Sequence, residues 1–210
     1  NLVGIDASGL ELRMLSHYMN DKDFTNEILH GDIHTANQKI AGLKSRNQAK
    51  TFIYAFIYGA GNEKLGSVVG GGKQDGQRLK QRFLANLPSL RNLKDRVTRA
   101  ASKGYIKGLD GRKIYIRSAH SALNALLQGG GSIVMKKALE LLNEYIIEHD
   151  LDAHFVANIH DEWQIEVVKK DAKKVGELGV LAIQNAGLVF DTKCPLDGEY
   201  HIGDNWSETH

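Results

Sequence analysis

The residues Arg46 to Gly59, RNQAKTFIYAFIYG, predict a helix whose chemistry organises the interpretation of the whole chain. Every fourth position carries a cation or a tyrosine: Arg46, Lys50, Tyr54 and Tyr58. A helix has about 3.6 residues per turn, so a step of four residues drifts by only about 40° and these side chains share one face. The opposite side is apolar, with Phe52, Ile53 and Phe56, and is predicted to be buried.

The polar face of this helix has two cations at its N-terminal end and two phenols at its C-terminal end, over about 18 Å of axis. Cations followed by aromatic rings suit a ligand that carries a triphosphate, a sugar and a base. An amphipathic core helix with a solvated basic edge is the structural alternative. The stretch by itself leaves both interpretations open.

Composition limits the class of protein. At 210 residues the chain is long enough for one large domain or two small ones. Apolar residues make up 42% and charged residues 25%, and the net charge of +2 permits a nucleic-acid partner without arguing for one. The single cysteine, Cys194, excludes an internal disulfide. No apolar run approaches the roughly 20 residues that span a bilayer, so no membrane partner is expected.

Two acids are predicted at the ends of strands. The apolar run Leu2–Ile5 ends on Asp6, and two β-prone runs, 155–159 and 163–167, are joined through His160-Asp161-Glu162. If these strands are neighbours in one antiparallel sheet, Asp6 and Asp161 converge and repel each other unless a divalent cation neutralises them. Oxygen ligands favour Mg²⁺ or Mn²⁺. Taken alone, Asp6 is also explained as a helix cap or turn residue.

Hydrophobic periodicity predicts the other elements and an α+β fold. Helices are expected near 10–18, 24–29, 77–103 with a break at Pro88, 119–148 and 169–188, with a hairpin over 106–117 and an edge strand within 190–202. Gly129–Gly131 interrupt the 119–148 helix, where something is expected to approach the backbone closely. Asn124 and Gln128 stand one turn apart just before them, so both amides are predicted to point toward the group that approaches there.

Three motifs, in order, resemble motifs A, B and C of family A DNA polymerases. They are DASGLELR at Asp6–Arg13, the Arg46–Gly59 helix and HDE at His160–Glu162. Three further stretches are similar to the bacteriophage replicative branch: GDIHT at Gly31–Thr35, KGLDGRK at Lys107–Lys113 and LNALLQGGG at Leu123–Gly131. The similarity runs in order from end to end, so the sequence is identified as a member of that family.

The resemblance implies two-metal nucleotidyl transfer to a primer 3′-OH. Asp6 and Asp161 would bind the metals, with the backbone carbonyl of Ala7 as a further ligand. Two Mg²⁺ ions are implied, with Mn²⁺ as a possible substitute. Glu162 would be an accessory acid near the primer end, and Lys50 would act as a general acid.

The resemblance also implies how the substrates bind. The triphosphate of the incoming deoxynucleotide would be gripped by His34, Arg46 and Lys50. Tyr58 would stack near the nascent base pair, Glu11 would close the sugar's 2′ position, and Tyr54 stands where a tyrosine is associated with acceptance of dideoxynucleotides. Contacts with primer–template DNA would come from Asn124 and Gln128 in the minor groove and from Arg112 and His160. Arg13 also matches a family position near the active site.

The domain organisation implied is a palm of residues 1–20 and 119–210, an antiparallel sheet backed by helices, with mostly helical fingers over 21–118. The family's thumb and exonuclease domains are absent from this chain. Because the chain opens directly on a strand, without Met, we expect a fragment, a processed piece or half of a split protein. A second polypeptide or an N-terminal region would supply the rest. The expected location is the cytoplasm, that of a bacterial host if a phage encodes the protein.

Three competing functions are weighed against DNA synthesis. A non-catalytic nucleic-acid-binding module with the polymerase fold would have no need to keep Asp6, Asp161 and Lys50 together. A two-metal nuclease would have no use for the cationic and aromatic face of the 46–58 helix. RNA synthesis is disfavoured by Glu11 at the position that would meet the 2′-hydroxyl.

Overall fold

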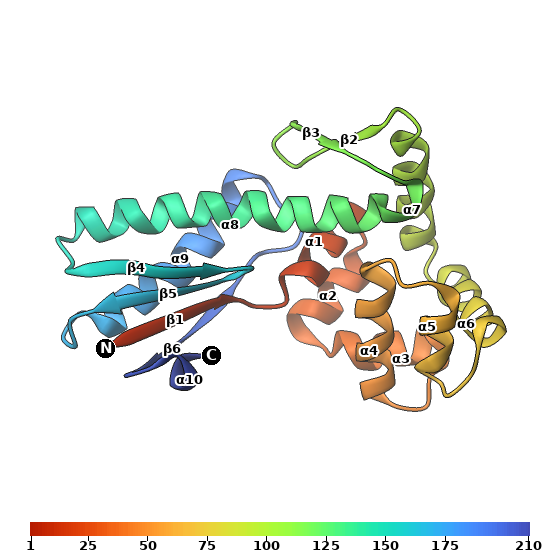
Figure 1. The fold of residues 1–210 in the computed structure, drawn as a ribbon, viewed down its shortest axis with the longest axis horizontal. Helices are drawn as coiled ribbons and strands as arrows, with labels where there is room; N and C mark the ends of the chain where they lie inside the picture. The colour runs from red at the N-terminus through yellow and green to blue at the C-terminus, as the bar shows by residue number, and fades with distance from the viewer. The chain divides into compact units, whose positions relative to one another are not determined.

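The computed structural model describes residues 1–210, which fold as two compact units (Figure 1). The sheet unit comprises Asn1–Met14 and Gln128–His210, and the helical unit is Leu15–Leu127. The borders fall inside two helices, α1 (Leu10–Met19) and α8 (Ala122–Glu148). None of the helices is both long and apolar enough to cross a membrane.

A four-stranded antiparallel sheet in the order β4-β5-β1-β6 forms the sheet unit's centre. The strands are β1 (Leu2–Ala7), β4 (Ala153–Ile159), β5 (Glu162–Val167) and β6 (Gly198–Gly203). The condition for convergence of Asp6 and Asp161, that their strands are neighbours in one antiparallel sheet, is met, because β1 and β5 are neighbours with Asp6 opposite Glu162. The predicted 190–202 strand does lie at the sheet edge, but its extent was wrong: pairing begins at Gly198, and Pro195 lies outside it.

Helices cover both faces of this sheet. Successive strand residues point to opposite faces. Gly179 of α9 (Ala172–Val189) lies against the side chain of Ile5, whereas Gly4 lies against Thr209 of α10 (Trp206–Thr209). A Cβ at Gly4 would meet the Thr209 carbonyl oxygen, so the absence of a side chain there lets the C-terminal helix sit directly on β1.

The helical unit consists of short helices and one hairpin. Its elements are α2 (Lys22–His30), α3 (Ile33–Ala41), α4 (Arg46–Ile57), α5 (Asn62–Ser67), α6 (Lys73–Asn86), α7 (Pro88–Ala101), β2 (Tyr105–Lys107), β3 (Lys113–Tyr115) and the 3₁₀ turn η1 (Ala119–Ser121). The short helices α3 and α5 were not predicted. The helix expected from residue 119 begins instead with η1, and its α-helical part starts at Ala122.

Helix α4 has the predicted buried face. The Ser45 hydroxyl caps its N-terminus by accepting the N–H of Gln48 at 3.2 Å. The predicted apolar residues Phe52, Ile53 and Phe56 are all buried. The rings of Phe52 and Phe56 meet Phe83 of α6 edge-on, with centroids 5.1 and 5.8 Å apart. This packing turns the opposite face of α4, with Arg46 and Lys50, toward solvent.

Candidate active site

The acidic edge of the sheet unit is formed where β1 ends beside the β4–β5 turn. Asp6 is the penultimate residue of β1, and Asp161 lies in the turn just before β5. The backbone N–H of Ala7 donates to the carbonyl oxygen of Asp161 at 3.1 Å, which ties the turn to the end of β1. His160 adopts a left-handed conformation, with φ of 56°, as the turn requires. The two predicted metal-binding aspartates are therefore held together by backbone pairing.

Electrostatic repulsion is concentrated at this edge. Burial and the neighbouring Asp161 carboxylate raise the pKa of Asp6 to about 6, with smaller contributions from Glu162, Glu199 and Glu11. Burial and the Glu11 carboxylate raise the pKa of Asp161. Both shifts mean that the ionised pair is destabilised, and a bound cation is the interaction that would reverse them.

The donor chemistry of the acidic edge fits Mg²⁺. No three Asp, Glu, His or Cys side chains converge to form a complete cage. Mg²⁺ needs no such cage, since it is commonly held by one or two carboxylates together with substrate phosphates and water. The residues that could hold it are Asp6 and Asp161, with the Ala7 carbonyl oxygen as a third, neutral oxygen ligand.

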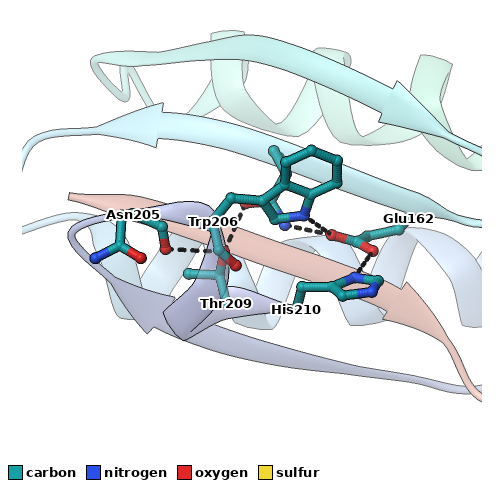
Figure 2. A network of polar contacts seen from close by, with 6 residues as sticks. Glu162, Asn205, Trp206, Thr209 and His210 are labelled. Atoms are coloured by element: carbon teal, nitrogen blue, oxygen red, sulfur yellow. Dashed lines mark hydrogen bonds and ion pairs between the residues drawn. The ribbon is translucent and has the colours of Figure 1, made fainter.

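Glu162 is fixed by the C-terminal residues of the chain (Figure 2). Its Oε1 accepts the indole N–H of Trp206 at 3.1 Å and a short hydrogen bond from Gln164. Its Oε2 pairs with Nδ1 of His210 at 2.6 Å. Burial opposes ionisation of Glu162, but these hydrogen bonds outweigh it and lower the pKa. Thr209 completes the network by donating to Oε1 of Gln164 at 2.8 Å.

This network was missed in the sequence. Helix α10 has four residues and therefore no periodic pattern, and its partner Glu162 is 44 residues away from Trp206 along the chain. The network shows that Glu162 is already saturated by the protein's own donors, unlike Asp6 and Asp161. The adjacent acids Asp161 and Glu162 thus have opposite environments, which raise the pKa of Asp161 and lower the pKa of Glu162.

The basic face of the helical unit comprises His34, Arg46 and Lys50. Asp32, which the sequence analysis did not single out, hydrogen-bonds to two of these residues. Asp32 caps α3 by accepting the backbone N–H groups of His34 at 3.1 Å and Thr35 at 3.4 Å, and its Oδ2 accepts the Thr35 hydroxyl at 2.8 Å. The same Oδ2 accepts a hydrogen bond from Nε–H of Arg46 at 2.5 Å. The Arg46 guanidinium, followed by these other donors, holds the pKa of Asp32 well below its usual range.

His34 lies on the same face and is 9% exposed. Its Nδ1 is buried without a hydrogen-bond partner, and its ring centroid is 6.0 Å from that of Tyr54. Burial, followed by the positive charge of Arg46, lowers the pKa of His34, with a further contribution from Lys50. The structure thus brings four predicted nucleotide-binding residues together: His34, Arg46, Lys50 and Tyr54.

The other predicted residues have the following places. Tyr58 is the C-cap of α4 and is 52% exposed. Glu11 is in the first turn of α1. Arg112 is in the β2–β3 turn, where it pairs with Asp110 at 2.6 Å. Arg13 donates to the carbonyl oxygens of Ser8 and Pro195, at 2.7 and 2.5 Å, and so holds the segment after β1.

The amides before the glycine cluster differ from each other. Asn124 is half-buried, and its Oδ1 is buried without a hydrogen-bond partner. Gln128 is exposed. At Gly131 the close neighbour is the Leu10 side chain, 3.1 Å from where a Cβ would stand. For that glycine, packing within the chain accounts for the missing side chain.

A carboxylate pair suited to Mg²⁺ and a cationic, aromatic helix face define a class of proteins that handle nucleoside triphosphates with divalent metal ions. The model of DNA polymerase family A matches residues 1–208, so the chain belongs to this family. The family identified from the three motifs and the α+β fold class are both confirmed.

Individual relatives agree with this assignment. The chain is 42% identical to a DNA-directed DNA polymerase of Escherichia phage Phieco32, over 99% of this chain and 40% of that protein. It is 43% identical to the DNA-directed DNA polymerase of Enterobacteria phage T3, over 99% of this chain and 33% of that protein. The chain therefore spans between a third and two fifths of these relatives.

A solved structure has the same fold. The POL domain of Pol1 from M. smegmatis, in complex with DNA primer–template and dNTP, superimposes with a TM-score of 0.87 at 21% identity. The similarity covers 99% of this chain and 40% of that chain.

Proposed function

We propose that this chain is the palm and fingers portion of a phage-type DNA polymerase, which adds deoxynucleoside triphosphates to a primer 3′-OH on a DNA template. The observation that carries the proposal is the pair of acids Asp6 and Asp161, brought together by the backbone bond from Ala7 to Asp161, in a chain that belongs to DNA polymerase family A. Residues 1–20 and 119–210 are assigned to the palm and 21–118 to the fingers.

Metal binding is assigned to Asp6, Asp161 and the Ala7 carbonyl oxygen. Bound Mg²⁺ ions, with Mn²⁺ as a substitute, supply charge neutralisation of the attacking and leaving oxygens during phosphoryl transfer. Glu162 is assigned an accessory role near the primer end. Its hydrogen bonds to Trp206 and His210 support a fixed carboxylate rather than a mobile metal ligand.

Binding of the nucleotide is assigned to the face of α4 and to His34. Arg46 and Lys50 bind the triphosphate as cations, and Lys50 donates a proton to the leaving pyrophosphate. Burial and the positive charge of Arg46 lower the pKa of His34. A ring N–H of His34 is assigned as a hydrogen-bond donor to the triphosphate. Tyr54 and Tyr58 contact the sugar and the base, and Glu11 blocks a 2′-hydroxyl.

Contacts with primer–template DNA are assigned to Asn124, Gln128, Arg112 and His160. A second polypeptide, or a further N-terminal region, is proposed to supply the thumb and exonuclease parts. The proposed site of action is the cytoplasm, that of a bacterial host if a phage encodes the protein.

Primer extension tests the proposal. The chain is assayed with Mg²⁺ and deoxynucleotides, alone and with the polypeptide encoded beside it, and each condition is repeated with Asp161→Ala. Metal-dependent extension that Asp161→Ala abolishes is the expected result. DNA binding without extension under every condition would instead support the non-catalytic nucleic-acid-binding module.

A further inference from the structure

A cavity of about 530 Å³ with an apolar floor lies in the helical unit, between α2, α3 and the junction of α6 with α7. Its apolar lining residues are Phe24, Ile33, Ala36, Ile40, Leu87 and Pro88. The side chains of Phe24, Ile33 and Leu87 are buried and form the floor, whereas Pro88 is exposed at the rim. None of these apolar residues belongs to the basic face that is proposed to bind the nucleotide.

Carboxylates surround this apolar floor. Four acids and a single lysine line the same cavity: Asp21, Asp23, Glu27, Asp32 and Lys39. Asp32 is paired with Arg46, but the other three acids take part in no ion pair. The cavity therefore combines buried apolar side chains with an uncompensated negative charge.

The charge of the cavity is opposite to that of the unit that contains it. Residues 15–127 carry 19 lysines and arginines against 8 aspartates and glutamates, a net charge of +11. Half of those eight acids line this one cavity. A cleft lined by one sign of charge concentrates ions of the opposite sign, and apolar surface rimmed by polar groups is typical of an interaction site.

Local helix chemistry accounts for only part of this acidic set. Asp21 and Asp32 are the N-caps of α2 and α3, and Asp23 lies in the first turn of α2, where an acid is favoured by the helix dipole. Glu27 lies one turn further along α2 and caps nothing. Capping also gives no reason for an apolar cavity beneath the carboxylates.

We propose that this cavity is a docking site for a basic segment of a partner protein, in which an arginine or lysine stands beside an apolar residue. The apolar side chain packs on the floor formed by Phe24, Ile33 and Leu87, and the cationic head pairs with Asp23 and Glu27. Long cationic side chains also bury their aliphatic stems on apolar surface while the charge stays close to water. The docking site does not depend on polymerase activity.

Lys39 favours a peptide over a free polyamine as the occupant. This lysine is exposed, lines the same cavity and takes part in no ion pair. A polyamine has only cationic donors, so Lys39 repels it. A peptide also has main-chain carbonyl oxygens, which accept hydrogen bonds from an ammonium group. A nucleic-acid strand is excluded because the four carboxylates repel its phosphates.

The test selects binders from a ribosome-displayed library of short random peptides. The target is the chain together with the polypeptide encoded beside it, without DNA or nucleotides. Synthetic copies of the enriched peptides are then titrated against wild type and against the cavity variant Asp23→Asn/Glu27→Gln. The matched control is Glu63→Gln/Asp95→Asn, which removes two exposed acids of the same unit that do not line the cavity. Circular dichroism checks that both variants are folded.

The enriched peptides are expected to carry Arg or Lys next to Leu, Ile, Val or Phe. They are expected to bind the cavity variant about fivefold more weakly than wild type, and the control variant within about twofold of wild type. Replacing the apolar residue of an enriched peptide by serine is expected to weaken binding about fivefold or more. No enrichment, enrichment of acidic peptides, no loss on the serine replacement, or equal losses in the two variants would each overturn the proposal.

A second measurement needs no variant. Labelling of carboxylates with a carbodiimide and glycinamide, followed by mass spectrometry, reports whether Asp23 and Glu27 are covered. Protection by an enriched peptide but not by spermine is expected. Equal protection by spermine would assign the cavity to a free polyamine. Protection by the neighbouring polypeptide before any peptide is added would assign it to an interface within the polymerase. Either result overturns the proposal of a separate protein partner.

Discussion

Aspartates in the two units have opposite electrostatic environments. In the helical unit, Asp21 accepts the Phe24 N–H at 3.0 Å and the Ser89 hydroxyl at 2.6 Å. Burial opposes its ionisation, but these donors outweigh burial and lower the pKa of Asp21. In the sheet unit, Asp6 faces other carboxylates instead, and burial together with Asp161 raises its pKa to about 6. The same side chain is thus stabilised as an anion in one unit and destabilised in the other.

This difference separates the structural from the functional interpretation of an aspartate. A cap or turn residue, the alternative explanation of Asp6, is recognised by the backbone N–H groups that it accepts, as at Asp21 and Asp32. Asp6 caps no helix and stands inside a strand. Its unfavourable surroundings have no structural benefit, which favours a charged ligand as the missing partner.

The largest effect is expected at the acidic edge. Asp161→Ala is expected to reduce primer extension by about 10³-fold or more, because a metal ligand that stabilises the charge of phosphoryl transfer is lost. The unfolding temperature without metal is expected to rise slightly, because one of two repelling carboxylates is gone. The assay is single-nucleotide incorporation, with thermal unfolding beside it. Glu148→Gln, an exposed acid at the end of α8, is the control. If the Asp161→Ala chain still extended primers, the raised pKa values at the acidic edge would not mark a metal site, and the contrast with Asp21 would have no functional meaning.

The next effect is expected at Asp32, whose carboxylate both caps α3 and holds Arg46. Asp32→Asn keeps a good cap but loses the ion pair. Because the pair is exposed, it contributes little to folding stability, and its loss is expected instead to raise the KM for deoxynucleotides about three- to tenfold. Steady-state incorporation kinetics measure this change, with thermal unfolding to confirm an intact cap.

A double-mutant cycle decides whether Asp32 acts through Arg46. In an Arg46→Ala background, the further change Asp32→Asn is expected to leave KM unchanged, since the guanidinium that it positions is absent. Additive effects of the two substitutions would show that Asp32 acts on nucleotide binding by another route, for example by positioning His34, whose backbone N–H it accepts.

Local sequence patterns could predict α4 and the two central strands, because their buried residues repeat with a period that belongs to one element. The same patterns put Asp6 and Asp161 at strand ends, but whether they lie close together depended on a strand pairing that only the structure gives. They could not predict that Trp206 and His210 hold Glu162, because no period connects a four-residue helix to a strand 44 residues earlier.

Asp32 is an intermediate case. An aspartate directly before Ile33–Ala41 is a recognisable helix start, so α3 and its cap were within reach of sequence analysis. Its bond to Arg46 was not, since that contact joins the start of one helix to the start of the next. Helix caps are local, whereas ion pairs between elements depend on tertiary packing.

A smaller effect is expected from the C-terminal network. Trp206→Phe keeps an aromatic ring but removes the indole N–H that Glu162 accepts. Loss of this hydrogen bond to a buried carboxylate is expected to lower the free energy of unfolding by about 1–2 kcal/mol. Urea denaturation measures the change, and Ser207→Ala, whose hydroxyl bonds only to Asn205 beside it, is the control. Equal stability of both variants would mean that Trp206 does not hold Glu162 in solution.

The smallest effect is expected at Asp21 and concerns the sign of its pH dependence. Asp21→Asn preserves a capping side chain but loses the charge-assisted bonds, so at neutral pH stability is expected to fall by less than about 1 kcal/mol. A carboxylate with a lowered folded-state pKa contributes stability above the unfolded pKa of 3.8 and loses that contribution as pH falls through the folded value. The stability difference between wild type and Asp21→Asn should therefore be constant from pH 7 down to about 5 and shrink below that, as pH falls past 3.8. Urea denaturation across this pH range measures the difference. A difference that grows toward acid pH would mean that folding raises the pKa of Asp21, as it does for Asp6.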